Sequence, residues 1–191
     1  MLLFKGNRNY LHGSDIYNYI TNIQKKKYKK LTITFSSMIK KNIVFKVHKI
    51  KKIEQLKFKN KPHVNALFEF SNYFINYSIF ESKKKIQGKY YYDENLMNFF
   101  FKIKKNSSHC NFTTSYSSIE VLIALNKYFH NKKIKKAQWL FSKLILHSEL
   151  LEANKKNFKL KLINNKFNKY TSNRIFQNNE EIGTIEFNRN D

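Results

Sequence analysis

Residues that could carry chemistry gather where two helices are expected to begin. In the first stretch, "NYLHGSDIYNYI" (9–20), His12 and Gly13 come just before Ser14 and Asp15. A histidine exchanges protons near neutral pH, and the unpaired backbone N–H groups of a helix start can hold a carbonyl oxygen as it becomes negative. One interpretation of this stretch is a catalytic corner, in which His12 transfers a proton beside the helix start. The alternative is an ordinary loop histidine followed by a glycine that permits a tight turn.

The second candidate helix start carries a carboxylate. Ser117 is followed three positions later by Glu120, the spacing of a capping box, in which each side chain bonds the backbone amide of the other residue. That structural purpose alone accounts for Glu120, as the positive end of the helix dipole accounts for Asp15. The competing interpretation is acid–base catalysis, because burial against an apolar helix raises the pKa of a carboxyl group.

The remaining histidines and the cysteine show no pattern that favours catalysis or metal binding. His109 and Cys110 precede the second helix, but adjacent side chains in an extended segment point in opposite directions and form no hydrogen-bonded pair. Cys110 is the only cysteine, which excludes an internal disulfide and a C-x-x-C site. His130 and His147 show no metal-ligand spacing. We therefore expect a cytoplasmic protein without a metal site.

The elements that must position these residues follow a definite order. In the first half we expect a helix capped by Ser14, with Ile16, Ile20 and Ile23 on one face. The β-branched and aromatic runs of that half predict strands at 2–5, 31–39, 42–50, 66–70 and 74–81.

The second half repeats this order. "AQWLFSKLI" lies over "LTITFSSMI" at an offset of 106 residues, and "EIGTIEFN" lies over "FINYSIFE" at an offset of 107. The expected elements are a helix from Ser117 or Ser118 and strands at 99–102, 137–145, 157–162 and 181–188. We therefore expect two similar halves, 1–81 and 99–191, joined by a connector at 82–98 within one compact domain.

The second helix is the most informative element. Its sequence "IEVLIALNKYF" (119–129) is apolar almost all the way round. A helix lying on a flat sheet buries one stripe, whereas this sequence predicts burial on nearly every side. A curled antiparallel sheet wrapped around the helix would bury it. The predicted fold class is α+β, with two halves that are each a curled antiparallel sheet around a central helix.

This arrangement resembles the hotdog-fold superfamily, in its tandem double-hotdog form. The segments that carry the resemblance are "YLHGSDIYNYI" with the strands after it, and "SSIEVLIALNKYF" with "AQWLFSKLI", "NFKLKL" and "EIGTIEFN". The resemblance covers most of the chain apart from the connector. It implies the handling of acyl thioesters on coenzyme A or acyl carrier protein, by dehydratases, hydratases and thioesterases.

The resemblance also implies roles for named residues. The acyl chain would lie between the two halves, with helix-start amides at Gly13, Ser14 and Ser118 holding the thioester carbonyl. His12 and Asp15 would act beside it, and Glu120 would be the helix-borne carboxylate that pairs with a histidine of the other half. Dehydration or thioester hydrolysis would follow, with no cofactor beyond the coenzyme A or phosphopantetheine of the substrate. A second hypothesis is a non-catalytic acyl- or partner-binding module of the same fold.

The net charge of +24 supports a third hypothesis, nucleic-acid binding through lysine clusters. The clusters are 25–30, 83–85 and 132–136. Only Arg8, Arg174 and Arg189 are arginines among 37 basic residues, which is more typical of an AT-rich genome than of phosphate recognition. Such lysines would also steer an acidic carrier protein or the phosphates of coenzyme A. No apolar run is long enough to span a membrane, and a homo-oligomer is compatible with the sequence.

Overall fold

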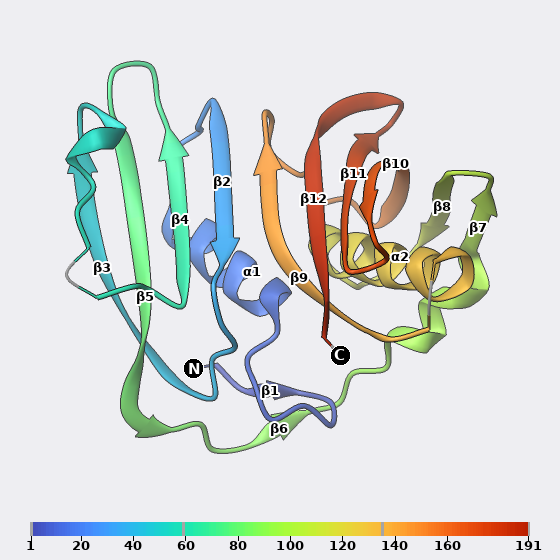
Figure 1. Ribbon diagram of the computed structural model, residues 1–191, viewed down its shortest axis with the longest axis horizontal. Coiled ribbons are helices and arrows are strands. Elements are labelled where there is room, and N and C mark those ends of the chain that lie inside the picture. The colour runs from blue at the N-terminus through green and yellow to red at the C-terminus, as the bar shows by residue number, and fades with distance from the viewer. Residues whose placement is uncertain (1, 59, 135, 191) are drawn as a thin grey trace. The chain divides into compact units, whose positions relative to one another are not determined.

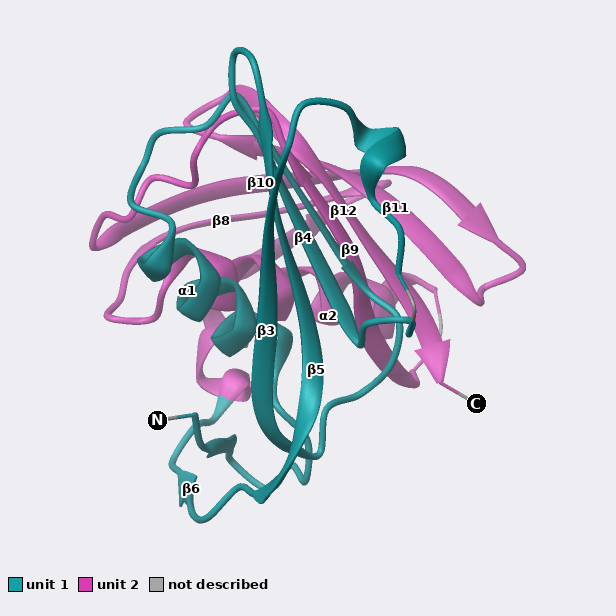
Figure 2. Cartoon of the chain, turned by 90° about the vertical axis from the view of Figure 1, so that its left-hand side faces the viewer, with its two compact units in different colours: residues 1–93 teal, residues 94–191 magenta. Residues whose placement is uncertain are grey.

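A computed structural model describes residues 2–58, 60–134 and 136–190. The chain divides into two compact units, Met1–Asp93 and Glu94–Asp191, called unit 1 and unit 2 (Figure 2). Each unit contains an α-helix and an antiparallel sheet (Figure 1). The α+β class and the two halves, each with a curled sheet around a helix, are confirmed.

Unit 1 places helix α1 beside an antiparallel sheet in the strand order β3-β5-β4-β2. Its elements are β1 (Phe4–Lys5), α1 (Gly13–Ile23), β2 (Lys30–Phe35), β3 (Lys41–Ile50), the 3-10 helix η1 (Ile53–Gln55), β4 (Val64–Glu69), β5 (Phe74–Lys85) and β6 (Lys89–Tyr90). The helix buries Ile16, Tyr17 and Ile20, while Ile23 is 41% exposed. Helix α1 is therefore one-sided, as its apolar spacing predicts.

The first strand is shorter than expected and belongs to a different sheet. Strand β1 pairs in parallel with β6, so that Phe4 lies opposite Lys89 and Lys5 opposite Tyr90. The two strands form a small sheet separate from the main sheet of unit 1. Strand β6 falls inside the segment 82–98, which the sequence suggested was only a connector, and it fixes the position of the N-terminal segment.

Unit 2 wraps helix α2 in an antiparallel sheet in the order β9-β12-β11-β10-β8-β7. Its elements are the 3-10 helix η2 (Glu94–Phe100), β7 (Phe101–Lys104), β8 (Ser107–Thr113), α2 (Ser118–Lys133), β9 (Gln138–Leu146), β10 (Lys155–Lys166), β11 (Tyr170–Gln177) and β12 (Glu180–Asn190). Helix α2 contacts η2 and four of these strands, β7, β8, β9 and β10 (Figure 1). The sheet thus surrounds the helix.

The burial of α2 confirms the prediction made from its sequence. Between Ile119 and Leu125, the apolar side chains are at most 3% exposed. Each fully buried Leu, Ile or Val contributes roughly 1.5–3 kcal/mol through removal of apolar surface from water, so this helix anchors unit 2. Among the described residues, no helix combines the length and apolar character that a membrane crossing requires.

Three strands, β6, β8 and β11, and one strand equivalence were not predicted correctly. Strands β8 and β11 were missed because their inward-facing positions include Ser108, Thr171 and Asn173, which give no apolar alternation. The segment 99–102 spans the end of η2 and the start of β7. The equivalence of "FINYSIFE" and "EIGTIEFN" is wrong in position, since β5 lies between β3 and β4 whereas β12 lies between β9 and β11.

Candidate active site at the start of helix α1

Helix α1 begins at Gly13, with His12 as the N-cap residue. The His12 carbonyl accepts hydrogen bonds from the amides of Asp15 at 3.0 Å and Ile16 at 3.3 Å. The predicted cap at Ser14 is wrong, because this residue lies inside the first turn and its hydroxyl bonds other side chains. Within the described part of the chain, no hydrogen bond from the amides of Gly13 and Ser14 is seen, so these two amides could donate to an acceptor.

The Ser14 hydroxyl joins three side chains in the interior of unit 1. Its Oγ lies 2.7 Å from the Lys5 Nζ, 2.7 Å from the His12 Nδ1 and 3.5 Å from an Asp15 oxygen. Lys5 and Ser14 are fully buried, and His12 is 3% exposed. Buried polar groups of this kind are costly unless hydrogen-bonded, so the fold selects this arrangement strongly.

The direction of these hydrogen bonds follows from the chemistry of the groups. A lysine ammonium only donates, so the Ser14 oxygen accepts from Lys5 and turns its own proton elsewhere. The His12 Nδ1 at 2.7 Å is a better acceptor position than the Asp15 oxygen at 3.5 Å. We infer that Nδ1 of His12 accepts this bond. A neutral His12 then carries its ring proton on Nε2.

Lys5 and Asp15 form the charged part of this cluster. The Lys5 Nζ lies 3.0 Å from an Asp15 oxygen, and the Tyr90 hydroxyl donates to the same oxygen at 2.8 Å. The ring of Tyr92 lies under the ammonium, with its centroid 4.3 Å away, which favours the cation further. Asp15 therefore neutralises a buried lysine, beyond the dipole role that its position predicted.

The local backbone explains how a lysine comes to be buried here. The pairing of β1 with β6 sets Lys5 directly opposite Tyr90, and the Gly6 amide donates to the Tyr90 carbonyl at 2.9 Å. Gly6 has φ +58, and a Cβ there would lie 3.0 Å from the Tyr92 carbonyl oxygen. Glycine permits both the left-handed turn and the close approach that bring the segment after β1 against Tyr92.

The start of α2 in unit 2 is built differently. The amide and hydroxyl of Ser117 donate to Glu120 Oε2 at 2.7 and 2.9 Å, which confirms the capping box. The Ser118 amide donates to both carboxylate oxygens of Glu152 at 3.0 Å, and Lys156 bonds the Ser118 hydroxyl at 3.2 Å. The amides of Ser117 and Ser118 thus already donate to carboxylates of unit 2 itself.

The predicted site residues therefore form two sets. In unit 1, His12, Gly13, Ser14 and Asp15 share one helix start, and the side chains of His12, Ser14 and Asp15 belong to one cluster. In unit 2, Glu120 and Ser118 lie together in the first turn of α2, where both make structural hydrogen bonds. The partners of these residues were not identified from the sequence; they are Lys5, Tyr90 and Tyr92 in unit 1 and Glu152 and Lys156 in unit 2.

The other candidate nucleophiles and bases are held in inert states. Burial raises the pKa of the Cys110 thiol to about 11, and burial followed by the charges of Lys104, Lys102 and Lys159 lowers the pKa of His109. Burial also lowers the pKa of His130 to about 3. Cys110 is buried on β8 while His109 is half-buried, consistent with side chains that point in opposite directions. The described residues contain no group of three or more side chains able to hold a metal.

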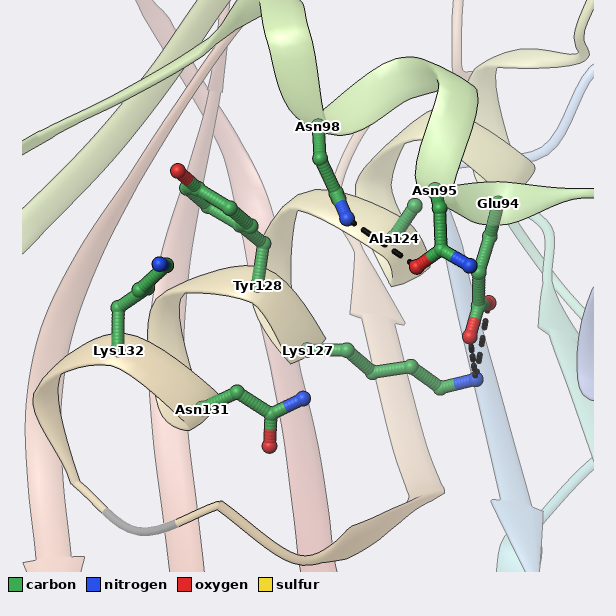
Figure 3. Close-up of a pocket in the computed structure, with 8 residues that line it drawn as sticks. All are labelled: Glu94, Asn95, Asn98, Ala124, Lys127, Tyr128, Asn131 and Lys132. Atoms are coloured by element: carbon green, nitrogen blue, oxygen red, sulfur yellow. Dashed lines mark hydrogen bonds and ion pairs between the residues drawn. The ribbon is translucent and has the colours of Figure 1, made fainter.

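A separate hollow of about 350 Å³ lies in unit 2, along η2 and the second half of α2 (Figure 3). Polar side chains dominate its lining: Glu94, Asn95, Asn98, Ala124, Lys127, Tyr128, Asn131 and Lys132. Lys127 and Glu94 form an ion pair at 3.2 Å across it (Figure 3). No residue that the sequence predicted for catalysis or substrate binding lines this hollow.

Comparison with known proteins supports the fold. No protein-family model matches the chain, and no curated protein matches it in sequence. A candidate thioesterase from Novosphingobium aromaticivorans DSM 12444 is similar in structure with a TM-score of 0.50 at 7% identity, covering 100% of this chain and 92% of the other. The bifunctional dehydratase-cyclase domain of ambruticin biosynthesis also has a TM-score of 0.50, at 6% identity, with 95% and 82% covered. The chain has a tandem hotdog fold.

In this tandem hotdog chain, each unit contributes one helix start with a buried lysine. Lys5 serves the first and Lys156 the second, and each bonds a serine hydroxyl in the first turn of its helix. Only in unit 1 does that serine also bond a histidine. The start of α1 is therefore the candidate active site.

Proposed function

We propose that this hotdog protein binds an acyl thioester at the start of α1 and acts on it by hydrolysis or dehydration. The observation that carries the proposal is the hydrogen bond between Ser14 and His12, supported from behind by buried Lys5. The thioesterase and dehydratase names of the two structural neighbours favour the same substrate class. The substrate's own coenzyme A or phosphopantetheine would be the only cofactor involved.

The geometry gives each residue a definite task in this proposal. The amides of Gly13 and Ser14 would hold the thioester carbonyl, with the helix dipole favouring negative charge on its oxygen. His12 would present the Nε2 proton to that oxygen or to a leaving group, because Ser14 occupies its Nδ1. This changes the role expected from the sequence, in which His12 was a base, to that of a hydrogen-bond and proton donor.

Asp15 and Glu120 have supporting tasks in this proposal. Asp15 would hold the Lys5 ammonium in place through their ion pair, so that Lys5 donates to the serine oxygen and the serine hydroxyl points toward His12. Glu120 would remain a cap, because one of its oxygens already receives both the amide and the hydroxyl of Ser117. A group that accepts two hydrogen bonds in its charged form is poorly suited to donate a proton.

Turnover of a panel of acyl-coenzyme A and acyl-pantetheine thioesters tests the proposal. The panel includes 3-hydroxyacyl and saturated chains, so that loss of water and hydrolysis are read separately. We expect His12→Ala to lower turnover by about 10²–10⁴-fold, the usual contribution of general acid–base catalysis. His48→Ala is the matched control, because His48 is an exposed histidine of β3 in the same unit.

The second candidate is an acyl-binding protein without turnover. The start of α2 favours it, because the amides of Ser117 and Ser118 there already donate to Glu120 and Glu152. Binding of a non-hydrolysable acyl-coenzyme A analogue, with no reaction of any thioester in the panel, would establish this candidate and refute the enzyme. Failure to bind any acyl thioester would refute both.

A further inference from the structure

Strand β3 leaves a long edge of the unit 1 sheet uncovered. It has ten residues, pairs with β5 on one side, and has no strand of residues 2–58 or 60–93 on the other. Figure 2 shows β3 in front of β5 and β4, at the end of its sheet. An edge of this kind presents a row of backbone N–H and C=O groups that can pair with another extended chain.

The side chains of β3 leave apolar groups exposed along this edge. Val44, Phe45 and Val47 are 51%, 40% and 49% exposed. Phe45 lies on the α1 side, 6.3 Å from the ring of Tyr19, and Val44 lies on the opposite face of the strand. Edge strands of proteins that stay single are normally short, charged along their length or covered. Strand β3 carries Lys41, Lys46 and Lys49, but it is long and also exposes apolar side chains near its centre.

The charge around this strand indicates what kind of chain would cover it. Residues 40–52 contain six lysines and no acidic residue. Lys46 lies over the ring of Phe80 at 5.8 Å and Lys49 over the ring of Tyr73 at 4.4 Å, so both ammonium groups stay close to the sheet. A second copy of the chain would bring two such lysine rows together, which is unfavourable. An acidic chain would be attracted instead.

We propose that the outer edge of β3 binds an acidic, extended segment of a partner protein as an added antiparallel strand. The segment carries acidic residues opposite Lys41, Lys46 and Lys49 and apolar residues opposite Val44, Phe45 and Val47. Backbone hydrogen bonds provide the affinity of such strand addition, and the alternating side chains provide its selectivity. This inference is independent of the chemistry at the start of α1.

The register of β3 defines a probe peptide. Written from the residue opposite Ile50 to the residue opposite Lys41, it is Val-Glu-Thr-Val-Glu-Val-Val-Ile-Thr-Glu with blocked ends. The control peptide has the same residues, reordered so that its glutamates face Val44, Phe45 and Val47. Fluorescence anisotropy of both labelled peptides against the full chain measures affinity. We expect the probe to bind at least about tenfold more tightly than the control. In the probe, glutamates face lysines and apolar residues face apolar residues, whereas in the control the glutamates face apolar residues.

Charge-reversal variants separate strand pairing from general attraction to a basic protein. Lys46→Glu with Lys49→Glu should weaken probe binding about tenfold or more, because each cross-strand attraction becomes a repulsion. The matched control is Lys26→Glu with Lys27→Glu, which makes the same charge change at exposed positions after α1. Hydrogen exchange provides the structural readout, since an added strand slows the exchange of outward-facing β3 amides.

Three results would overturn the proposal. Equal binding of the two peptides, or equal loss in the two double variants, would mean that only net charge is recognised. A concentration-dependent dimer that disappears in Lys46→Glu with Lys49→Glu would identify a second copy as the occupant. Binding of an oligonucleotide that protects β3 amides better than the peptide does would assign the edge to nucleic acid.

Discussion

The starts of α1 and α2 share the same group of side chains, a buried lysine with a serine and a carboxylate, but the hydrogen bonds around the two groups differ. In both, a buried lysine bonds a serine in the first helical turn and a nearby carboxylate: Lys5 with Ser14 and Asp15, and Lys156 with Ser118 and Glu152. In unit 2 the carboxylates then bond the helix-start amides. In unit 1 Asp15 bonds Lys5 and Tyr90, and the serine turns to His12.

The difference shows how a helix start becomes either a structural anchor or a candidate site. A carboxylate on the first amides satisfies the positive helix end and closes it to outside anions. Glu152 bonds both Lys156 and the Ser118 amide, whereas Asp15 bonds Lys5 and the Tyr90 hydroxyl. In unit 1 the serine hydroxyl bonds a histidine instead. The position of one acidic side chain therefore decides whether the first amides of a helix already donate to a carboxylate of the same unit.

The largest expected effect on stability comes from removing the buried lysine at each helix start. Lys5→Met leaves Asp15, whose side chain is 12% exposed, as an uncompensated charge, and should lower the free energy of unfolding by about 3–5 kcal/mol. Lys156→Met should lower it by only about 1–2 kcal/mol, because the side chain of Glu152 is 52% exposed and remains hydrated. Urea unfolding of both variants measures the difference.

A double variant shows whether the unpaired charge is the cause. Asp15→Asn added to Lys5→Met removes that charge, while an amide oxygen still accepts the hydrogen bond of the Tyr90 hydroxyl. We expect at least half of the lost stability to return. If Lys5→Met and Lys156→Met lower the free energy of unfolding by the same amount, the different exposure of Asp15 and Glu152 has no effect on stability, and the predicted difference between the units is wrong.

Helix α2 and its capping box were predictable because the residues that form them are close together in the sequence. The capping box of Ser117 and Glu120 spans three positions, and the apolar run from Ile119 to Leu125 lies on consecutive residues. Both features belong to a single turn or a single helix, so the sequence alone contains them. The curled sheet then followed from the need to bury such a helix on every side.

The cluster of unit 1 could not be predicted because its partners are distant in the chain. Asp15 and Tyr90 are 75 positions apart, and Lys5 and Ser14 are separated by nine. Lys5 is the last residue of the strand predicted at 2–5, and no sequence signal marks it as a buried charge. Only the pairing of β1 with β6, inside a segment taken for a connector, brings these groups together.

The pH dependence of the free energy of unfolding tests the buried histidine of unit 2. His130 lies fully buried in unit 2, with Thr171 at 3.0 Å from its Nε2, and burial lowers its pKa from 6.5 to about 3. The unfolded chain binds a proton between these two values and the folded chain does not. Stability from neutral His130 is therefore complete above about pH 6.5 and is lost as pH falls toward 3, by up to about 1.4 kcal/mol per pH unit.

The measurement is the free energy of unfolding between pH 4 and 7 in three chains. His130→Gln should flatten the slope relative to the parent chain, since the amide has no proton to gain. His147→Gln is the control, because His147 is exposed in the same unit and should keep the parent slope. A parent slope that persists in His130→Gln would assign the acid sensitivity to carboxylates instead.

The smallest expected effect tests whether Glu120 is only an anchor. Glu120→Gln keeps an acceptor for the Ser117 amide and hydroxyl but loses the charge, and should cost about 0.5–1 kcal/mol of stability. Thioester turnover, if present, should change less than about twofold, because this carboxylate already holds a helix cap. Ser117→Ala removes the other half of the box and should show the same pattern. A loss of turnover in Glu120→Gln that Ser117→Ala does not share would mean that the carboxylate acts on substrate, and the helix start of α2 would then count as part of the site.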